Sequence, residues 1–157
     1  MGRITLERIH NATPDAVMLV GELEAEMAGI YDDEMRHGLS IERIFQPHIA
    51  FFIAYLDGCA AGCGGIAFED GYGELKRMYV RPAERGQGVV QAVIAQLEAE
   101  AAAHGIKRVT LETGDAQLAA MRVYERAGYR RCGAFGYYCG LPASATRRSV
   151  FFEKLLG

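Results

Sequence analysis

The sequence has little net charge, no long apolar run and no export signal. Its formal charge is only −3, from 17 basic and 20 acidic residues, so no chain-wide basic field exists to attract nucleic acid or a membrane surface. The longest apolar run, residues 49–56, is far shorter than the roughly 20 residues of a membrane helix. Glu7 stands where a signal peptide would be apolar. We therefore expect a cytoplasmic protein with no nucleic-acid or membrane partner, which binds any anion at a local site.

Cysteine is also scarce, and its spacing matches no zinc pattern. The four cysteines are Cys59, Cys63, Cys132 and Cys139. Without an export signal they are expected to stay reduced, and we predict no metal site. Because they lie outside the motifs described below, we expect no cysteine nucleophile.

The chain shows no repeat, linker or low-complexity tract, and its 157 residues, half of them apolar, match one domain over residues 1–157. Strands are predicted over residues 4–9, 49–56, 60–68, 74–80, 107–112, 129–135 and 150–156. Helices are predicted over residues 14–30, 40–45 and 117–127, and a further helix begins at residue 89 and ends at residues 104–105. Hairpins followed by β-α-β units indicate an α+β (mixed α/β) fold with a sheet of mixed direction.

Residues 79–90 combine a strand end, a glycine-bearing turn and the start of an amphipathic helix. Gly86 and Gly88 allow backbone amides to turn inward without a blocking Cβ, and the helix start adds partial positive charge. This combination suits a pyrophosphate, although a plain strand-to-helix turn is the alternative. Gln91 stands where a dinucleotide fingerprint has its third glycine, and no GK[ST] triplet occurs. Neither a Rossmann site nor a P-loop is therefore expected.

Two blocks of the sequence resemble the GNAT family of N-acetyltransferases. Residues 85–90, Arg-Gly-Gln-Gly-Val-Val, match its cofactor motif [QR]xxGx[GA], except that Val90 replaces the final Gly or Ala. Residues 117–129 match its block N-x-x-A-x-x-x-Y-x-x-x-G-[FY], with Gln117 replacing Asn. The resemblance spans nearly the whole chain. It implies a GNAT-like acyl-CoA N-acyltransferase fold, with a mostly antiparallel sheet of about six to seven strands flanked by about four helices.

The resemblance also implies an enzyme that transfers an acetyl group from acetyl-CoA to a primary amine by direct attack in a ternary complex. The pyrophosphate would bind amides of the turn, and the pantetheine arm would pair with strand backbone between the fourth and fifth strands. The implied cofactor-binding residues are Met78, Tyr79, Val80, Arg85, Gly86, Gln87, Gly88, Val89, Val90, Gln117 and Tyr124. For Gln117, a polar residue facing water is the alternative.

Tyr124 aligns with the family's tyrosine that protonates the departing CoA thiolate. A phenol, with a pKa near 10 against roughly 8.5 for a thiol, can hold a proton and offer it as charge develops on sulfur. Packing is the alternative interpretation, because Ala120, Val123, Tyr124 and Ala127 follow the spacing of a buried helix face.

A general base is needed because an amine substrate arrives protonated. Glu74 is the candidate, since some family members carry a base glutamate on this strand, and Glu112 at the end of the next strand is second. Strand alternation predicts that Glu74, Lys76, Met78 and Val80 share one face. A solvated face or a Glu74–Lys76 surface pair is the alternative for Glu74.

The sequence indicates the amine acceptor less clearly than it indicates the cosubstrate. Asp32, Asp33 and Glu34, with the aromatic stretch of residues 135–138, predict a small cationic amine bound by charge pairing and cation–π contact. A peptide or protein amine is the alternative acceptor. A non-catalytic CoA-binding module and an acyltransferase for longer acyl-CoA are the alternative functions, and the apolar strand at residues 150–152 could form a homodimer contact.

Overall fold

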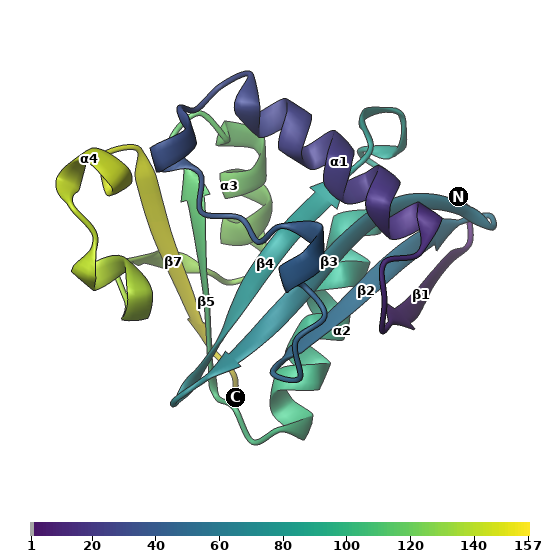
Figure 1. Ribbon diagram of the computed structural model, residues 1–157. Coiled ribbons are helices and arrows are strands. Elements are labelled where there is room, and N and C mark those ends of the chain that lie inside the picture. Colours follow the sequence, from purple (N-terminus) through teal and green to yellow (C-terminus); the bar gives the residue numbers. More distant parts are fainter. Residues whose placement is uncertain (1) are drawn as a thin grey trace.

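A seven-stranded sheet forms the centre of the molecule, with strands in the order β1-β2-β3-β4-β5-β7-β6 (Figure 1). The computed structural model describes residues 2–157. Its strands are β1 (Ile4–Ile9), β2 (Ile49–Leu56), β3 (Cys59–Glu69), β4 (Tyr72–Val80), β5 (Arg108–Gly114), β6 (Arg130–Cys132) and β7 (Ser149–Leu155). Its helices are α1 (Pro14–Ala28), α2 (Val89–Ala103), α3 (Leu118–Arg126) and α4 (Ala143–Thr146). Short 3-10 turns cover Asp33–Met35, Ile41–Arg43, Pro82–Glu84 and Gly136–Gly140.

The direction of the strands agrees with the sequence-based prediction. Within residues 2–157, β4 and β5 pair in parallel, and every other neighbouring pair of strands is antiparallel. The predicted α+β fold with a mostly antiparallel mixed sheet is therefore confirmed. The start of α1 also follows the prediction, because the Thr13 hydroxyl accepts a hydrogen bond from the Ala16 amide at 3.3 Å.

The predicted helix over residues 40–45 is wrong. The structure has a 3-10 turn over Ile41–Arg43, and Ser40 before it makes no side-chain cap bond. Its hydrogen bond runs from the Arg43 amide to the Ser40 carbonyl at 2.9 Å, three residues back, which is the pattern of a 3-10 turn. The fourth helix is instead α4, whose four residues, Ala143–Thr146, are too few to show an apolar period.

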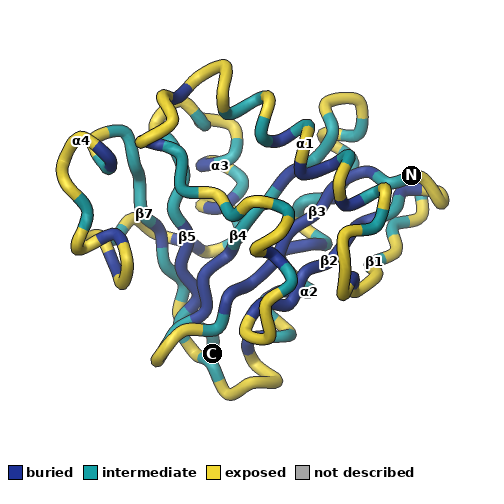
Figure 2. The backbone as a smooth tube through the Cα atoms, viewed as in Figure 1, coloured by how far each residue is buried: buried dark blue, intermediate teal, exposed yellow. Residues whose placement is uncertain are grey.

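The sheet separates two apolar cores, and Figure 2 shows buried segments concentrated along the central strands. Helix α1 covers one face, where Leu19 and Ile53 are fully buried. Helix α2 covers the other face, where Leu97 and Val109 are fully buried. Burial of these apolar faces fixes which side of the sheet each helix occupies.

A β-bulge in β4 changes the alternation of its side chains. Cys63 pairs with Tyr79 and Gly65 pairs with Lys76, so Arg77 and Met78 together stand opposite a single residue of β3. Arg77 has a φ of 54°, a backbone conformation that side chains other than glycine rarely adopt.

The bulge overturns the prediction that Glu74, Lys76, Met78 and Val80 share one face. Met78 and Val80 pack against the α2 core together with Leu75, whereas Tyr79 joins the α1 core. Since side chains alternate along the strand before the bulge, Glu74 and Lys76 lie on the face opposite Leu75. The extra residue thus puts Glu74 and Met78 on opposite faces of the sheet.

The two parallel strands share only a short stretch of pairing. Residues 73–75 of β4 pair with residues 109–111 of β5, and no pair between these strands follows within the described chain. Strand β5 continues beside β7 up to the pair of Gly114 with Ser149. The sheet therefore opens between β4 and β5.

Replacing Leu97 with Ala should lower the free energy of unfolding by about 3 kcal/mol, because it leaves a cavity in the α2 core. Leu118→Ala on α3 is the matched control, since Leu118 is 59% exposed, and it should cost less than about 1 kcal/mol. Urea denaturation of both variants measures the difference. Equal losses would contradict this account of the core.

Candidate active site

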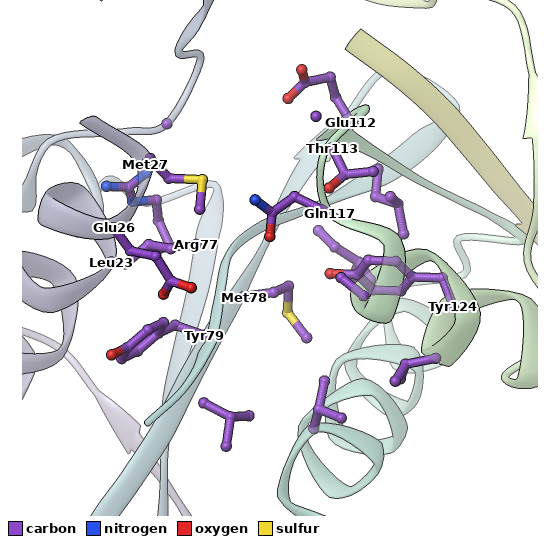
Figure 3. A pocket seen from close by; sticks show the side chains of 18 of the residues that line it. Leu23, Glu26, Met27, Arg77, Met78, Tyr79, Glu112, Thr113, Gln117 and Tyr124 are labelled. Carbon is purple, nitrogen blue, oxygen red and sulfur yellow. The ribbon is translucent and has the colours of Figure 1, made fainter. Parts of the chain in front are cut away.

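A cleft of about 580 Å³ lies where β4 and β5 separate (Figure 3). Leu23 and Met27 of α1 line one side, and Tyr124 of α3 lines the other. The strand residues 74–80 and 111–114 line the cleft between these helices. Unpaired backbone of β4 therefore borders a concave site at the middle of the sheet, where an extended ligand can add its own hydrogen bonds.

The structure brings nearly all of the sequence-predicted site residues to this cleft. Among the predicted catalytic and cofactor-binding residues, Gln87 is the exception, because it does not line the cleft. The predicted residues that line it are Glu74, Met78, Tyr79, Val80, Arg85, Gly86, Gly88, Val89, Val90, Gln117 and Tyr124.

The turn before α2 has the backbone geometry of an anion site. Gly86 and Gly88 have φ values of 80° and 86°, and Gly88 is the residue that caps α2. A Cβ built on Gly86 would meet no atom within 4 Å, and one on Gly88 would approach only Ile4, at 3.8 Å. Glycine is needed here for the backbone conformation. Amides of the turn and the first turn of α2 can therefore face a phosphate group.

Arg85 ties this turn to its surroundings. Its Nε donates to the Val80 carbonyl at 3.0 Å, and its Nη2 lies 3.3 Å from both carboxylate oxygens of Glu26 on α1. The guanidinium is thus already paired with protein groups. Its structural contribution is to hold the turn against the end of β4 and against α1.

Val90 and Gln117 are the two positions that depart from the GNAT motifs. Val90 lines the cleft and packs against the α2 core, so its side chain is accommodated by apolar contacts. Gln117 precedes α3 and makes no capping bond with its side chain. Figure 3 shows the Gln117 amide and the Met78 side chain pointing into the same cleft.

Tyr124 combines packing with access to the cleft. The residue is 7% exposed, and its ring centre lies 6.1 Å from that of Tyr129 and 6.4 Å from that of Phe152. Burial raises the pKa of Tyr124 above its usual value. The phenol therefore carries its proton at neutral pH while its side chain lines the cleft.

Glu74 is buried and already hydrogen-bonded, so it is not the solvated surface residue considered from the sequence. Its Oε2 accepts from the Tyr138 hydroxyl at 2.5 Å and from Lys76 Nζ at 3.2 Å. Lys76 Nζ also lies 3.4 Å from the Tyr138 hydroxyl. The three side chains form one closed network at the edge of the cleft. Burial and the neighbouring carboxylates raise the pKa of Tyr138, which stays protonated.

Glu112 lies on the neighbouring strand and also lines the cleft (Figure 3). Its Oε2 accepts from the Ser149 hydroxyl at 2.7 Å. Burial is the main cause that raises the pKa of Glu112 above the usual carboxyl value, while Ser149, His37 and Lys76 oppose the rise. A carboxyl with a raised pKa beside a cleft is suited to exchanging a proton near neutral pH.

The predicted cation site in the acidic loop is not assembled. Asp32 and Glu34 do not line the cleft, and Asp33, which does, has a side chain that is 99% exposed and is paired with Arg36 at 3.0 Å. Of the aromatic stretch over residues 135–138, the cleft is lined by Tyr138. The acidic loop therefore contributes one carboxylate that is already paired.

The cleft is also lined by cationic side chains that were not assigned to the site from the sequence. Four of them are Arg36, Lys76, Arg77 and Arg148. Arg77 and Arg36 both pair with Glu24 of α1. The four come from three separate segments, since Lys76 and Arg77 are adjacent on β4, and no motif or spacing in the sequence indicates that these segments meet.

Arg148 and Tyr31 connect the two sides of the cleft. The Tyr31 hydroxyl accepts from the Ala116 amide at 3.1 Å, beyond the end of β5. The Arg148 guanidinium lies 4.7 Å from the centre of the Tyr31 ring and bonds the Ile30 carbonyl at 3.2 Å. Arg148 also pairs with Asp115 at 2.8 Å. The chain after α1 is thus joined to the segment between β5 and α3.

The family to which these features belong is shown by comparison with known proteins. A model of the Acetyltransferase (GNAT) family matches residues 17–129, which include the glycine turn and Tyr124. The chain belongs to the GNAT family. This membership confirms the resemblance inferred from the two sequence blocks.

Some GNAT relatives cover nearly the whole chain and others cover part of it. The IAA acetyltransferase of Azospirillum brasilense is 35% identical over 158 residues, covering 99% of this chain and 100% of that protein. Human N-acetylaspartate synthetase is 33% identical over 111 residues, covering 68% of this chain and 36% of that protein. The solved PaiA N-acetyltransferase of Thermoplasma acidophilum, in complex with coenzyme A, shares the fold with a TM-score of 0.75 at 17% identity, covering 98% and 99% of the two chains.

This GNAT protein is therefore an acetyl-CoA-dependent N-acetyltransferase. Its cleft fits the cosubstrate in two ways. The space beside the glycines of the turn is open for a phosphate group, and the unpaired edge of β4 leads away from the turn and can pair with an extended arm. Within residues 2–157, no group of three His, Cys, Asp or Glu side chains could hold a metal ion. None of the helices in this part of the chain is long and apolar enough to cross a membrane.

Replacing Gly88 with Ala should raise the Kd for coenzyme A about tenfold or more, because the backbone leaves the conformation that presents the amides of the turn. Gly71→Ala is the matched control. Gly71 has a φ of 84° and open space around its Cβ position, but it lies in the β3–β4 hairpin. Both variants should lose about 1 kcal/mol of stability, while calorimetric titration should show unchanged coenzyme A binding for Gly71→Ala alone.

Proposed function

We propose that this enzyme acetylates the primary amine of a small molecule that also carries an anionic group. The observation that supports this acceptor is the mixed charge at the end of the cleft away from the glycine turn. Glu74 and Glu112 lie there together with Arg36, Lys76 and Arg148. An acceptor with groups of both signs complements this arrangement better than the purely cationic amine expected from the acidic loop.

Arg36 is the cation best placed to bind the anionic group. Its partner Asp33 is almost fully exposed, and such a solvent-exposed pair contributes little stability. Its second partner, Glu24, is 3.7 Å away and also serves Arg77. A substrate carboxylate could therefore replace a weak contact of Arg36 without leaving a buried charge unpaired. The name of the relative N-acetylaspartate synthetase, which refers to an acetylated amino acid, agrees with this acceptor class.

The reaction we propose is direct attack within a ternary complex. Acetyl-CoA supplies a thioester carbonyl, and the neutral amine nitrogen forms a bond to this carbon. As the bond from carbon to sulfur breaks, the Tyr124 hydroxyl gives its proton to the sulfur. The phenol regains a proton as the new amide nitrogen loses one. Tyr124 is suited to this role because it is protonated, lines the cleft and belongs to the rigid helix α3.

The direct test is to incubate the protein with acetyl-CoA and a panel of amines, and to measure free thiol and acetylated product. The panel pairs amino acids with their decarboxylated amines, and adds polyamines and short peptides. We expect turnover of carboxylate-bearing acceptors, with KM at least tenfold lower than for their decarboxylated partners. Preference for polyamines or peptides would overturn the proposed acceptor class. Absence of free thiol with every amine tested would favour a non-catalytic CoA-binding module.

Tyr124→Phe should lower kcat about 100-fold with little change in stability, because the ring packing is kept and the proton donor is lost. No hydrogen bond to the Tyr124 hydroxyl is found within residues 2–157, so its removal leaves no partner unpaired. Tyr129→Phe is the control, since that hydroxyl donates to Glu98 at 2.8 Å, away from the cleft. It should reduce the melting temperature and spare kcat. A Tyr124→Phe enzyme with normal kcat would show that Tyr124 only packs.

A further inference from the structure

We infer that Glu112 is the general base that accepts the proton of the acceptor amine, and that Glu74 is a positioning residue in a fixed polar network. This assignment rests on the proposed amine acetylation and concerns the residue that makes the amine reactive. From the sequence Glu74 was preferred and Glu112 came second. The structure reverses that order by position, by hydrogen bonding and by surroundings.

The register of the two parallel strands places Glu112 further along the cleft than Glu74, in the direction of Met78. Leu75 pairs with Leu111, and Glu74 pairs with Thr110. Glu112 is therefore level with Lys76, two residues further along the cleft than Glu74, or about 7 Å at the usual rise of a strand. The backbone of Met78, where the arm of the cosubstrate would pair, lies in that same direction.

Both carboxylates lie on the same face of the sheet. Leu75 and Leu111 point into the α2 core, so the adjacent Glu74 and Glu112 point to the other face. The choice between them therefore depends on how each carboxylate is held.

The hydrogen bonds of the two carboxylates differ. Glu74 Oε2 accepts from both Tyr138 and Lys76, and a proton placed on this oxygen would displace one of these donors. Glu112 Oε2 accepts a single bond, from Ser149. Within residues 2–157 no bond to Oε1 is found for either carboxylate, so the difference is that Glu74 is held by two side chains, one of them an ammonium group, and Glu112 by a single hydroxyl.

The groups around Glu112 are suited to proton exchange. His37, from the segment after α1, and the Lys76 ammonium of β4 face Glu112, and Glu74 is the neighbouring carboxylate. Ser149 of β7 holds one carboxylate oxygen. Burial is the largest cause that raises the pKa of Glu112, which brings its titration nearer to neutral pH.

The proposed step moves one proton. A proton leaves the ammonium nitrogen of the acceptor and binds Glu112 Oε1, so the carboxylate becomes a neutral carboxyl and the amine gains a free electron pair. The amine then attacks the thioester as described above. Glu112 releases the proton to solvent after the product leaves, which restores the carboxylate for the next cycle.

The test compares pH profiles of kcat/KM for Glu112→Gln, Glu74→Gln and the unaltered enzyme with one amine acceptor. A base accepts protons only above its pKa, so kcat/KM of the unaltered enzyme should rise with pH through the titration of Glu112. Glu112→Gln should lose this rise and lower kcat at pH 7 about 100-fold or more. Glu74→Gln should keep the rise even if KM changes. Loss of the rise in Glu74→Gln with its retention in Glu112→Gln would overturn the assignment.

Ser149→Ala provides a readout that a purely structural role would not produce. The Ser149 hydroxyl favours the ionised form of Glu112, so its removal should raise the pKa of Glu112 and shift the rise of kcat/KM to higher pH. An unshifted profile would contradict the assignment. Exposed Glu69→Gln, in the β3–β4 hairpin, controls for loss of a carboxylate elsewhere and should leave the profile unchanged.

Melting temperature and coenzyme A titration of each variant separate a folding defect from lost catalysis. A Glu112→Gln protein that binds coenzyme A normally and lacks the pH rise supports the assignment. Failure of the proposed function would appear differently, as no acetyl transfer by the unaltered protein. Failure of the present inference would appear as transfer by Glu112→Gln with an unchanged pH profile.

Discussion

The early end of pairing between β4 and β5 is the constraint on which the rest of the site depends. After the pair of Leu75 with Leu111, the bulge at Arg77 interrupts the regular alternation of β4, while β5 stays beside β7. Backbone groups that a continuous sheet would satisfy internally are thus left beside a cleft. An extended ligand such as the GNAT cosubstrate could supply the missing hydrogen-bond partners.

The same opening brings together side chains from distant parts of the chain. Residues after α1, residues of β4 and β5, and Arg148 just before β7 meet at the end of the cleft away from the glycine turn. Carboxylates and cations lie together there, and most of them already have a protein partner. Such prearranged charges favour an acceptor whose own charges match in position, because a mismatched group would lose water without gaining a partner.

The sequence was most informative where function depends on local backbone geometry. The glycine turn, the start of α1 and the order of strands were all predictable, because capping, turn and alternation rules act over a few residues. The predicted face of Met78 was wrong because a single extra residue in β4 shifts the alternation, and nothing near Arg77 in the sequence marks the bulge. The cations of the cleft were missed because they meet only through tertiary packing.

The interactions of Arg148 connect the two rims of the cleft. One guanidinium holds the Ile30 carbonyl, the Tyr31 ring and the Asp115 carboxylate, which belong to opposite rims of the cleft. The width of the opening is therefore preorganised by the protein before any ligand arrives. A ligand that enters such a cleft loses its own freedom but does not have to order the walls, so more of its contact energy remains as affinity.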